Sequence, residues 1–286
     1  MADLKGKIAV VTGATSGIGR WVAEGIAAQG ATTVVVGRSS ERAEAAAREI
    51  SHATGSGDVV PVVVTDLALR SEVERLATAL LDRFPRIHIL VNNAGAYYAR
   101  REVTAEGLER TFALNVLAPY ILTARLLPRM AESAPARVVM VTSEAHQGQH
   151  VEFDDLQATR AYKGFRQYGR SKLELLLLTR EFARRASERP VTVNAVHPGF
   201  VASGFGRNNP GPIGRVLAVL EVLFARNVRK AAADVVYVAT DPSLDRTTGE
   251  YFARRKLRPG SVASREMTQA RQLFDICGGL APAASR

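Results

Sequence analysis

The stretch that decides the fold is residues 7–30, KIAVVTGATSGIGRWVAEGIAAQG. An apolar, β-branched run at 7–13 leads through a glycine-rich turn into a segment of helical periodicity that ends at Gly30. Glycines let the backbone approach a pyrophosphate, and the N-terminus of the following helix favours its negative charge. A glycine turn can also be a plain connector, but its position between a first strand and a first helix favours a nucleotide site.

The rest of the chain repeats this alternation of strand and helix. We expect further strands at 31–38, 59–68, 87–95, 136–145, 191–199 and 249–255, and helices at 40–50, 71–84, 107–133, 167–190 and 229–242. Strands that are apolar throughout and separated by helices indicate a parallel sheet covered on both faces. The predicted fold class is therefore α/β, with residues 1–286 as a single domain: a Rossmann-type doubly wound parallel sheet of about seven strands. Its ligand should lie beyond the carboxyl ends of the strands.

The composition limits the classes of protein that the chain can be. Of 286 residues, 47% are apolar, which is enough for a core, and Cys277 is the only cysteine, so no disulfide framework can form within the chain. We therefore expect a reducing, cytoplasmic location. No apolar run approaches the roughly 18 residues of a membrane span, so no transmembrane segment is expected. The net charge of +10 is spread over helices without a nucleic-acid-binding signature, so no nucleic acid is expected as a partner.

Tyr168 and Lys172 stand four residues apart at the head of the apolar helix expected at 167–190. Side chains at this spacing share one face of a helix. A free tyrosine has a pKa of about 10, and a cation beside it favours the phenolate and lowers that pKa. The pair thus predicts a general acid–base catalyst for a carbonyl or an alcohol. Taken alone, the pair fits better as the polar rim of an amphipathic helix, but together with the other motifs it favours the catalytic interpretation.

Several motifs follow one another along the chain: the Gly-x-x-x-Gly-x-Gly turn at 13–19, Asn92-Asn93-Ala94-Gly95, Asn115, Ser143, Tyr168-x-x-x-Lys172 and Pro198-Gly199. In this order and spacing they resemble the short-chain dehydrogenase/reductase family over nearly the whole chain. The resemblance implies a hydride-transferring enzyme with the catalytic residues Asn115, Ser143, Tyr168 and Lys172. Ser143 would donate a hydrogen bond to the substrate oxygen, and Lys172 would also bind the nicotinamide ribose. Asn115 would distort its helix and hold a water that links Lys172 to solvent.

The second strand ends at Gly37-Arg38, without a carboxylate to accept hydrogen bonds from the adenosine 2′-hydroxyl of NAD. A guanidinium there can hold a 2′-phosphate, so the predicted cofactor is NADP(H). Ser16 departs from the pattern, because many NADP-preferring members carry a second basic residue in its place. The resemblance also implies that Asp66 and Leu67 contact the adenine and that Asn92 lines the adenosine-ribose side. The full set of expected cofactor-binding residues is Gly13, Thr15, Ser16, Gly17, Ile18, Gly19, Arg38, Asp66, Leu67, Asn92, Ala94, Gly95, Tyr168, Lys172, Pro198, Gly199 and Val201.

Residues 143–157, 195–203 and 249–280 resemble the retinol-dehydrogenase-like branch of the family, whose members act on lipophilic alcohols and carbonyls. The resemblance implies a carbonyl reductase or alcohol dehydrogenase, and a homo-oligomer (dimer or tetramer) is plausible. We expect 203–229 to form a substrate lid and 254–286 a C-terminal extension. The lid carries an apolar stripe of Ile213, Val216, Leu217, Leu220, Leu223 and Phe224. Arginines around it, Arg207, Arg215, Arg226 and Arg229, could allow peripheral contact with an anionic membrane.

Three other functions stay open from the sequence. A catalytically silent nucleotide-sensing regulator could use the same fold, although the retained catalytic residue types speak against it. An epimerase or dehydratase of the wider superfamily shares Tyr-x-x-x-Lys but usually differs in glycine spacing and length, and a nucleic-acid binder would show salt-dependent binding. No metal site is expected: His146 and His150 are four apart, but Gly148 separates them and no carboxylate or thiol completes a site. His197 is interpreted as a packed turn residue.

Overall fold

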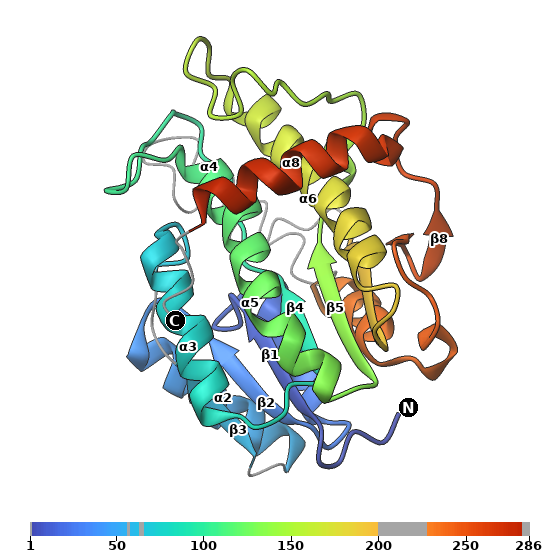
Figure 1. Cartoon of the computed structure of the whole chain (residues 1–286). Helices are drawn as coiled ribbons and strands as arrows, with labels where there is room; N and C mark the ends of the chain where they lie inside the picture. Colours follow the sequence, from blue (N-terminus) through green and yellow to red (C-terminus); the bar gives the residue numbers. More distant parts are fainter. Residues whose placement is uncertain (1, 56–57, 63–65, 200–227, 282–286) are drawn as a thin grey trace.

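The computed structural model describes residues 2–55, 58–62, 66–199 and 228–281 (Figure 1). These residues contain an eight-stranded sheet of order β3-β2-β1-β4-β5-β6-β7-β8, in which only β7 and β8 pair antiparallel. The strands are β1 (Ile8–Thr12), β2 (Thr32–Val36), β3 (Val59–Val62), β4 (Ile89–Asn92), β5 (Ala136–Val141), β6 (Val191–His197), β7 (Tyr251–Ala253) and β8 (Lys256–Arg258). The predicted doubly wound, Rossmann-type α/β fold is confirmed, with one strand more than expected.

Helices cover both faces of the sheet because alternate strand residues point to opposite sides. They are α1 (Gly17–Ala27), α2 (Ser40–Thr54), α3 (Arg70–Arg83), α4 (Arg110–Phe112), α5 (Ala118–Glu132), α6 (Gly164–Arg185) and α8 (Met267–Leu280), and residues 228–240 are also helical. Val10 and Val138 pack toward α3, α5 and α6, which lie in front of the sheet in Figure 1. Their neighbours Val11 and Val139 pack toward α1, α2 and the helix at 228–240. Burial on both faces is why these strands are apolar throughout.

The C-terminal part contains a hairpin and a helix that the sequence did not predict. The turn from β7 to β8 has Arg254 and Arg255 at φ values of 53° and 58°, in the left-handed region where glycine or asparagine is usual. Helix α8 then crosses α6 (Figure 1) and buries Ala270, Leu273 and Cys277, which fall on one face. The extension is therefore packed onto the helix that begins with Tyr168 and Lys172.

Two expectations fall outside the described residues: the lid at 203–229, apart from its last two residues, and Val201. Among the described residues, one helical stretch, Arg110–Glu132, is long and apolar enough to cross a membrane by length and composition. Within that stretch, 72% of the apolar window is buried inside the protein, which is the environment of a core helix.

Candidate active site

The glycine-rich turn between β1 and α1 has the geometry that a phosphate requires. Gly13 and Gly17 have φ values of 65° and 57°, which side chains other than glycine rarely adopt. A Cβ on Gly19 would lie 2.4 Å from both the Asn93 Nδ2 and the Gly13 carbonyl oxygen. Ser16 makes no side-chain cap hydrogen bond, and the first turn of α1 has no acidic residue. The positive end of the helix dipole therefore faces the glycine-rich turn, and no carboxylate in the first turn of the helix offsets its attraction for an anion.

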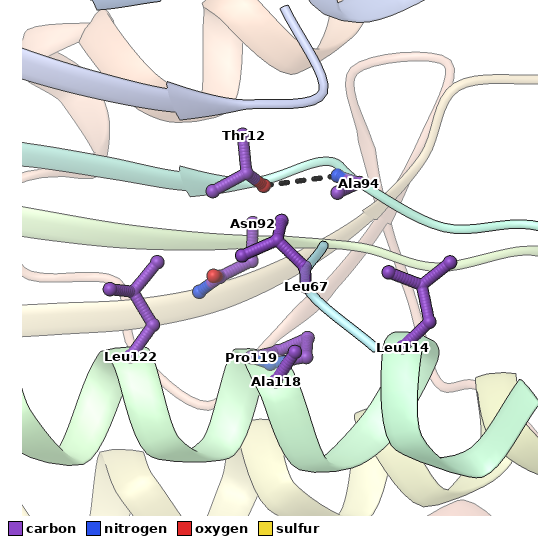
Figure 2. A pocket seen from close by; sticks show the side chains of 8 residues that line it. All are labelled: Thr12, Leu67, Asn92, Ala94, Leu114, Ala118, Pro119 and Leu122. Atoms are coloured by element: carbon purple, nitrogen blue, oxygen red, sulfur yellow. Dashed lines mark hydrogen bonds between the residues drawn. The ribbon is translucent and has the colours of Figure 1, made fainter. Parts of the chain in front are cut away.

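Thr12 joins the ends of β1 and β4, and the sequence analysis missed it. Its hydroxyl donates to the Val91 carbonyl at 3.3 Å and accepts from the backbone amides of Asn93 and Ala94, each at 3.0 Å; Figure 2 draws the bond to Ala94. The Asn93 side chain returns a bond to the Thr12 carbonyl at 2.8 Å. These bonds fix the Asn92–Gly95 segment beside the phosphate turn.

A small open hollow lies between these strand ends and helix α5 (Figure 2). Its lining is mostly apolar: Thr12, Leu67, Asn92, Ala94, Leu114, Ala118, Pro119 and Leu122. The Asn92 side chain is buried and donates to the Thr123 hydroxyl at 3.0 Å and to the Met140 sulfur at 3.3 Å. Asn92 thus contributes to the packing around the hollow, while its carboxamide donor is already used within the protein.

Asp66, the expected adenine contact, is fixed by a residue that the sequence analysis missed. Arg110 donates to the Asp66 carboxylate at 2.9 Å and to the Tyr98 hydroxyl at 3.1 Å. The other Asp66 oxygen accepts from the Ala68 amide at 3.1 Å. Among the described residues, each carboxylate oxygen thus has one partner, and each keeps acceptor capacity for a ligand.

Arg38 lies exposed at the end of β2, next to the phosphate turn. The two segments are in direct contact, because a Cβ on Gly37 would lie 2.2 Å from the Thr15 methyl group. The Ala14 amide also donates to the Val36 carbonyl at 3.0 Å. The Arg38 guanidinium is thus close to the segment that would bind an anion at the N-terminus of α1.

The structure brings Ser143, Tyr168, Lys172 and Asn115 together beyond the end of β5. The Tyr168 hydroxyl hydrogen-bonds the Ser143 side chain. The Lys172 ammonium donates to the Val141 carbonyl at 3.1 Å and lies 5.5 Å from the centre of the Tyr168 ring. A Cβ on Gly95 would be 3.2 Å from both the Lys172 Nζ and the Asn115 Oδ1, so this glycine makes room for the two side chains.

Asn115 lies in a π-helical turn, Ala113–Leu117, between α4 and α5. Its carboxamide accepts from the Ala96 amide at 2.9 Å, and it donates to the Ala96 carbonyl and to the Ser171 hydroxyl, each at 3.0 Å. The helix is thus distorted at the residue for which the family resemblance implied a distortion. A π-turn inside a helix frequently marks a functional site.

The expected direction of the Tyr168 pKa is wrong for this structure. Burial raises the pKa of Tyr168 above 10, and the hydrogen bond with Ser143 offsets only part of that rise. Burial also lowers the pKa of Lys172 to about 8. The sequence argument allowed for the cation but not for the depth at which both groups lie, and desolvation acts against the charged form of each.

The histidines that attracted attention in the sequence have separate environments. His146 is fully buried with its Nδ1 2.7 Å from the Ser143 carbonyl oxygen, whereas His150 is exposed and pairs with Glu152 at 3.5 Å. His197 is buried as expected, but it is the last residue of β6 rather than part of the following turn. Gly199, two residues further on, has a φ of 95°, which accounts for a glycine at that position.

A doubly wound sheet with a glycine-lined first turn and a Ser–Tyr–Lys cluster beyond its central strand defines a dinucleotide-dependent oxidoreductase. The family model described as short chain dehydrogenase matches residues 7–210, and the chain belongs to this family, which uses nicotinamide cofactors. The predicted retinol-dehydrogenase-like branch is also confirmed by similarity to curated proteins.

Two such relatives are similar over most of their length. "Dehydrogenase/reductase SDR family member 13" of Bos taurus is 37% identical over 98% of this chain and 74% of its own. "Retinol dehydrogenase 12" of Mus musculus is 36% identical over 96% of this chain and 86% of its own.

Solved structures are similar in the same way. A protein of Mycobacterium paratuberculosis has a TM-score of 0.80 at 26% identity, covering 99% of this chain and 97% of its own. The Pseudomonas aeruginosa RhlG/NADP active-site complex has a TM-score of 0.68 at 27% identity, covering 88% of this chain and 95% of its own.

Proposed function

We propose that this protein is an NADP(H)-dependent oxidoreductase that interconverts a carbonyl and an alcohol on a lipophilic small molecule. The observation that supports this most directly is the cluster of Ser143, Tyr168 and Lys172, in which a phenol bonds a hydroxyl beside a buried ammonium. A cluster of this kind can polarise a carbonyl oxygen and supply it with a proton.

The chain's own residues fit a dinucleotide phosphate. Gly13, Gly17 and the N-terminus of α1 would hold the pyrophosphate, since both glycines have a positive φ and the first turn of α1 has no acidic residue. Arg38 would bind the 2′-phosphate, because it is exposed at the contact between β2 and the phosphate turn. Asp66 and Leu67 would meet the adenine.

A bound nicotinamide cofactor would supply the hydride for carbonyl reduction or accept it in alcohol oxidation. Tyr168 holds its proton at neutral pH, because its pKa is raised, so it acts as the acid that protonates the substrate oxygen during reduction. The Ser143 oxygen accepts from the Ala145 amide at 3.2 Å, and its hydroxyl hydrogen, which bonds Tyr168 in this structure, would turn to the substrate oxygen and stabilise the charge that develops there. Lys172 is mostly protonated at pH 7 and stabilises Tyr168 as the proton leaves.

A lipophilic substrate is supported by similarity to proteins named retinol dehydrogenases. The test is a panel of aldehydes and ketones of increasing chain length, followed by NADPH and NADH absorbance. Turnover with NADPH, rising with chain length, supports the proposal. Tight NADPH binding without oxidation by any carbonyl would instead favour the nucleotide-sensing regulator.

A further inference from the structure

His146 connects the proposed catalytic serine to the C-terminal extension. It closes the short helical turn Glu144–His146 and is fully buried. Its Nδ1 lies 2.7 Å from the Ser143 carbonyl oxygen, and its Nε2 lies 3.3 Å from the Ser261 amide nitrogen. A carbonyl can only accept and an amide N–H can only donate, so the ring must be neutral, with its proton on Nδ1.

The segment that donates to His146 is itself fixed to helix α6. Arg180 on α6 donates to the Pro259 carbonyl at 3.1 Å and to the Ser264 hydroxyl at 3.1 Å, and it also bonds the Ser264 carbonyl. Tyr251 packs edge-on against the His146 ring, with centres 5.2 Å apart. The imidazole thus contacts the Ser143 carbonyl, Tyr251 of β7 and Ser261 of the extension, and the extension is in turn fixed to α6 by Arg180.

We propose that His146 is a positioning residue that sets the place of Ser143, and that residues 259–264 of the C-terminal extension are thereby part of the catalytic apparatus. This inference rests on the role proposed for Ser143. The family model ends at residue 210, so the supporting segment lies outside the part of the chain that the model matches.

His146 can affect catalysis because its ring bonds the backbone carbonyl of Ser143, the residue whose hydroxyl would contact the substrate. The Ser143 carbonyl also accepts from the His146 amide at 3.2 Å, so loss of the ring would leave it with the longer of two bonds. The Ser143 side chain bonds Tyr168 and would touch the substrate oxygen. A displacement of this peptide by a fraction of an ångström would shift the hydroxyl that the transition state requires.

Protonation of His146 at Nε2 should break its hydrogen bond with the Ser261 amide. Burial lowers the pKa of His146, and Arg180 and His197 also oppose its charging, whereas the hydrogen bond to the Ser143 carbonyl and the charge of Glu144 favour it; the Tyr251 ring adds no charge. With a proton on Nε2, both the imidazolium and the Ser261 N–H would be donors, and no hydrogen bond could form between them. We therefore expect kcat to fall on the acid side, below the ordinary histidine pKa of about 6.5.

Two pairs of variants separate positioning from general packing. His146→Asn keeps a donor near the Nδ1 position, and His146→Gln keeps an acceptor near the Nε2 position. Ser261→Pro removes the amide N–H, while its matched control Ser261→Ala keeps it and removes only the hydroxyl. We expect kcat to fall on the order of 10- to 100-fold in His146→Gln and Ser261→Pro, with NADPH affinity unchanged. Ser261→Ala should stay near wild type and His146→Asn should lie between, without the acid limb.

Wild-type kcat and an unchanged acid limb in His146→Gln would overturn the inference, and this profile decides even where Ser261→Pro does not fold. Tyr168→Phe in the same assay separates the two proposals. If Tyr168→Phe retains turnover, the proposed function fails. If Tyr168→Phe is inactive while the His146 variants behave as wild type, only the positioning role fails.

Discussion

Replacing Glu174 by glutamine should stabilise this protein at pH 8 and above but not at pH 4. Glu174 lies on α6 with no exposed surface, and neither of its carboxylate oxygens has a hydrogen-bond partner among the described residues. Arg170 one turn earlier attracts it, whereas Glu109 repels it. Burial dominates these effects and raises the pKa of Glu174 from 4.5 to about 8.

The sign follows from the two pKa values. Below pH 4.5 the carboxyl is protonated in both the folded and the unfolded chain, so burial of the group carries no ionisation penalty. Between 4.5 and 8 the unfolded chain loses the proton while the folded chain keeps it, so stability falls as the pH rises. At about 1.4 kcal/mol per pH unit, the full loss above pH 8 is on the order of 4–5 kcal/mol.

Urea unfolding of wild type and Glu174→Gln at pH 4 and pH 8.5 measures this difference. Glu181, on the same helix and equally buried, is the control: it accepts from Arg184 and Arg185 at 2.7 Å each, and the Arg184 hydrogen bond is the main reason that its pKa is lowered. Glu181→Gln should therefore lose stability, and more at pH 8.5 than at pH 4. If Glu174→Gln is no more stable than wild type at pH 8.5, the carboxyl is solvated or paired and the reasoning is wrong.

Three predictions concern the proposed chemistry. Tyr168→Phe should bind NADPH as wild type does and lose roughly 10²–10⁴-fold in kcat, and near-normal turnover would exclude Tyr168 as the acid. Arg38→Ala should weaken NADPH about tenfold or more with little change for NADH, measured by fluorescence titration, and an equal loss for both would contradict the 2′-phosphate contact. For a lipophilic pocket, two added methylenes on an aldehyde should raise kcat/KM on the order of tenfold, and a flat series would count against it.

The sequence predicted the fold well where burial leaves a simple pattern. Strands such as Ala136–Val141 are covered on both faces, so they are continuous apolar runs with helices between them. Strand β8 was not predicted because the turn before it has Arg254 and Arg255 in left-handed conformations, where glycine or asparagine would normally indicate a turn. α8 was interpreted as a tail because only a narrow stripe of it is fully buried. The single-domain boundaries, the lid and the oligomeric state stay predictions.

The site was predictable to the extent that its residues are close in sequence or fall in known motifs. Tyr168 and Lys172 are such a pair, and the family resemblance implied a helix distortion at Asn115, which the structure shows as a π-turn. The residues that hold them in place were not predicted, because their partners are far away along the chain: Thr12 with Asn93, Arg110 with Asp66, and His146 with Ser261. A single sequence gives no signal for such contacts. It also gives no measure of how deeply Tyr168 is buried, and this burial raises its pKa where the sequence predicted a lower one.

Lys172 and Glu174 of α6 are both buried and stand two residues apart, so they lie on opposite sides of the helix. Glu174 faces the packed interior near Cys277 of α8, where burial outweighs the attraction of Arg170 and keeps the carboxyl protonated up to about pH 8. Lys172 faces the candidate site, and of its three ammonium donors the described part of the chain uses one, on Val141. Burying an ammonium with open donors costs stability, and that cost is consistent with donors kept for a ligand. The same helix thus carries one carboxyl that burial keeps protonated and one ammonium whose unused donors are consistent with the chemistry that we propose.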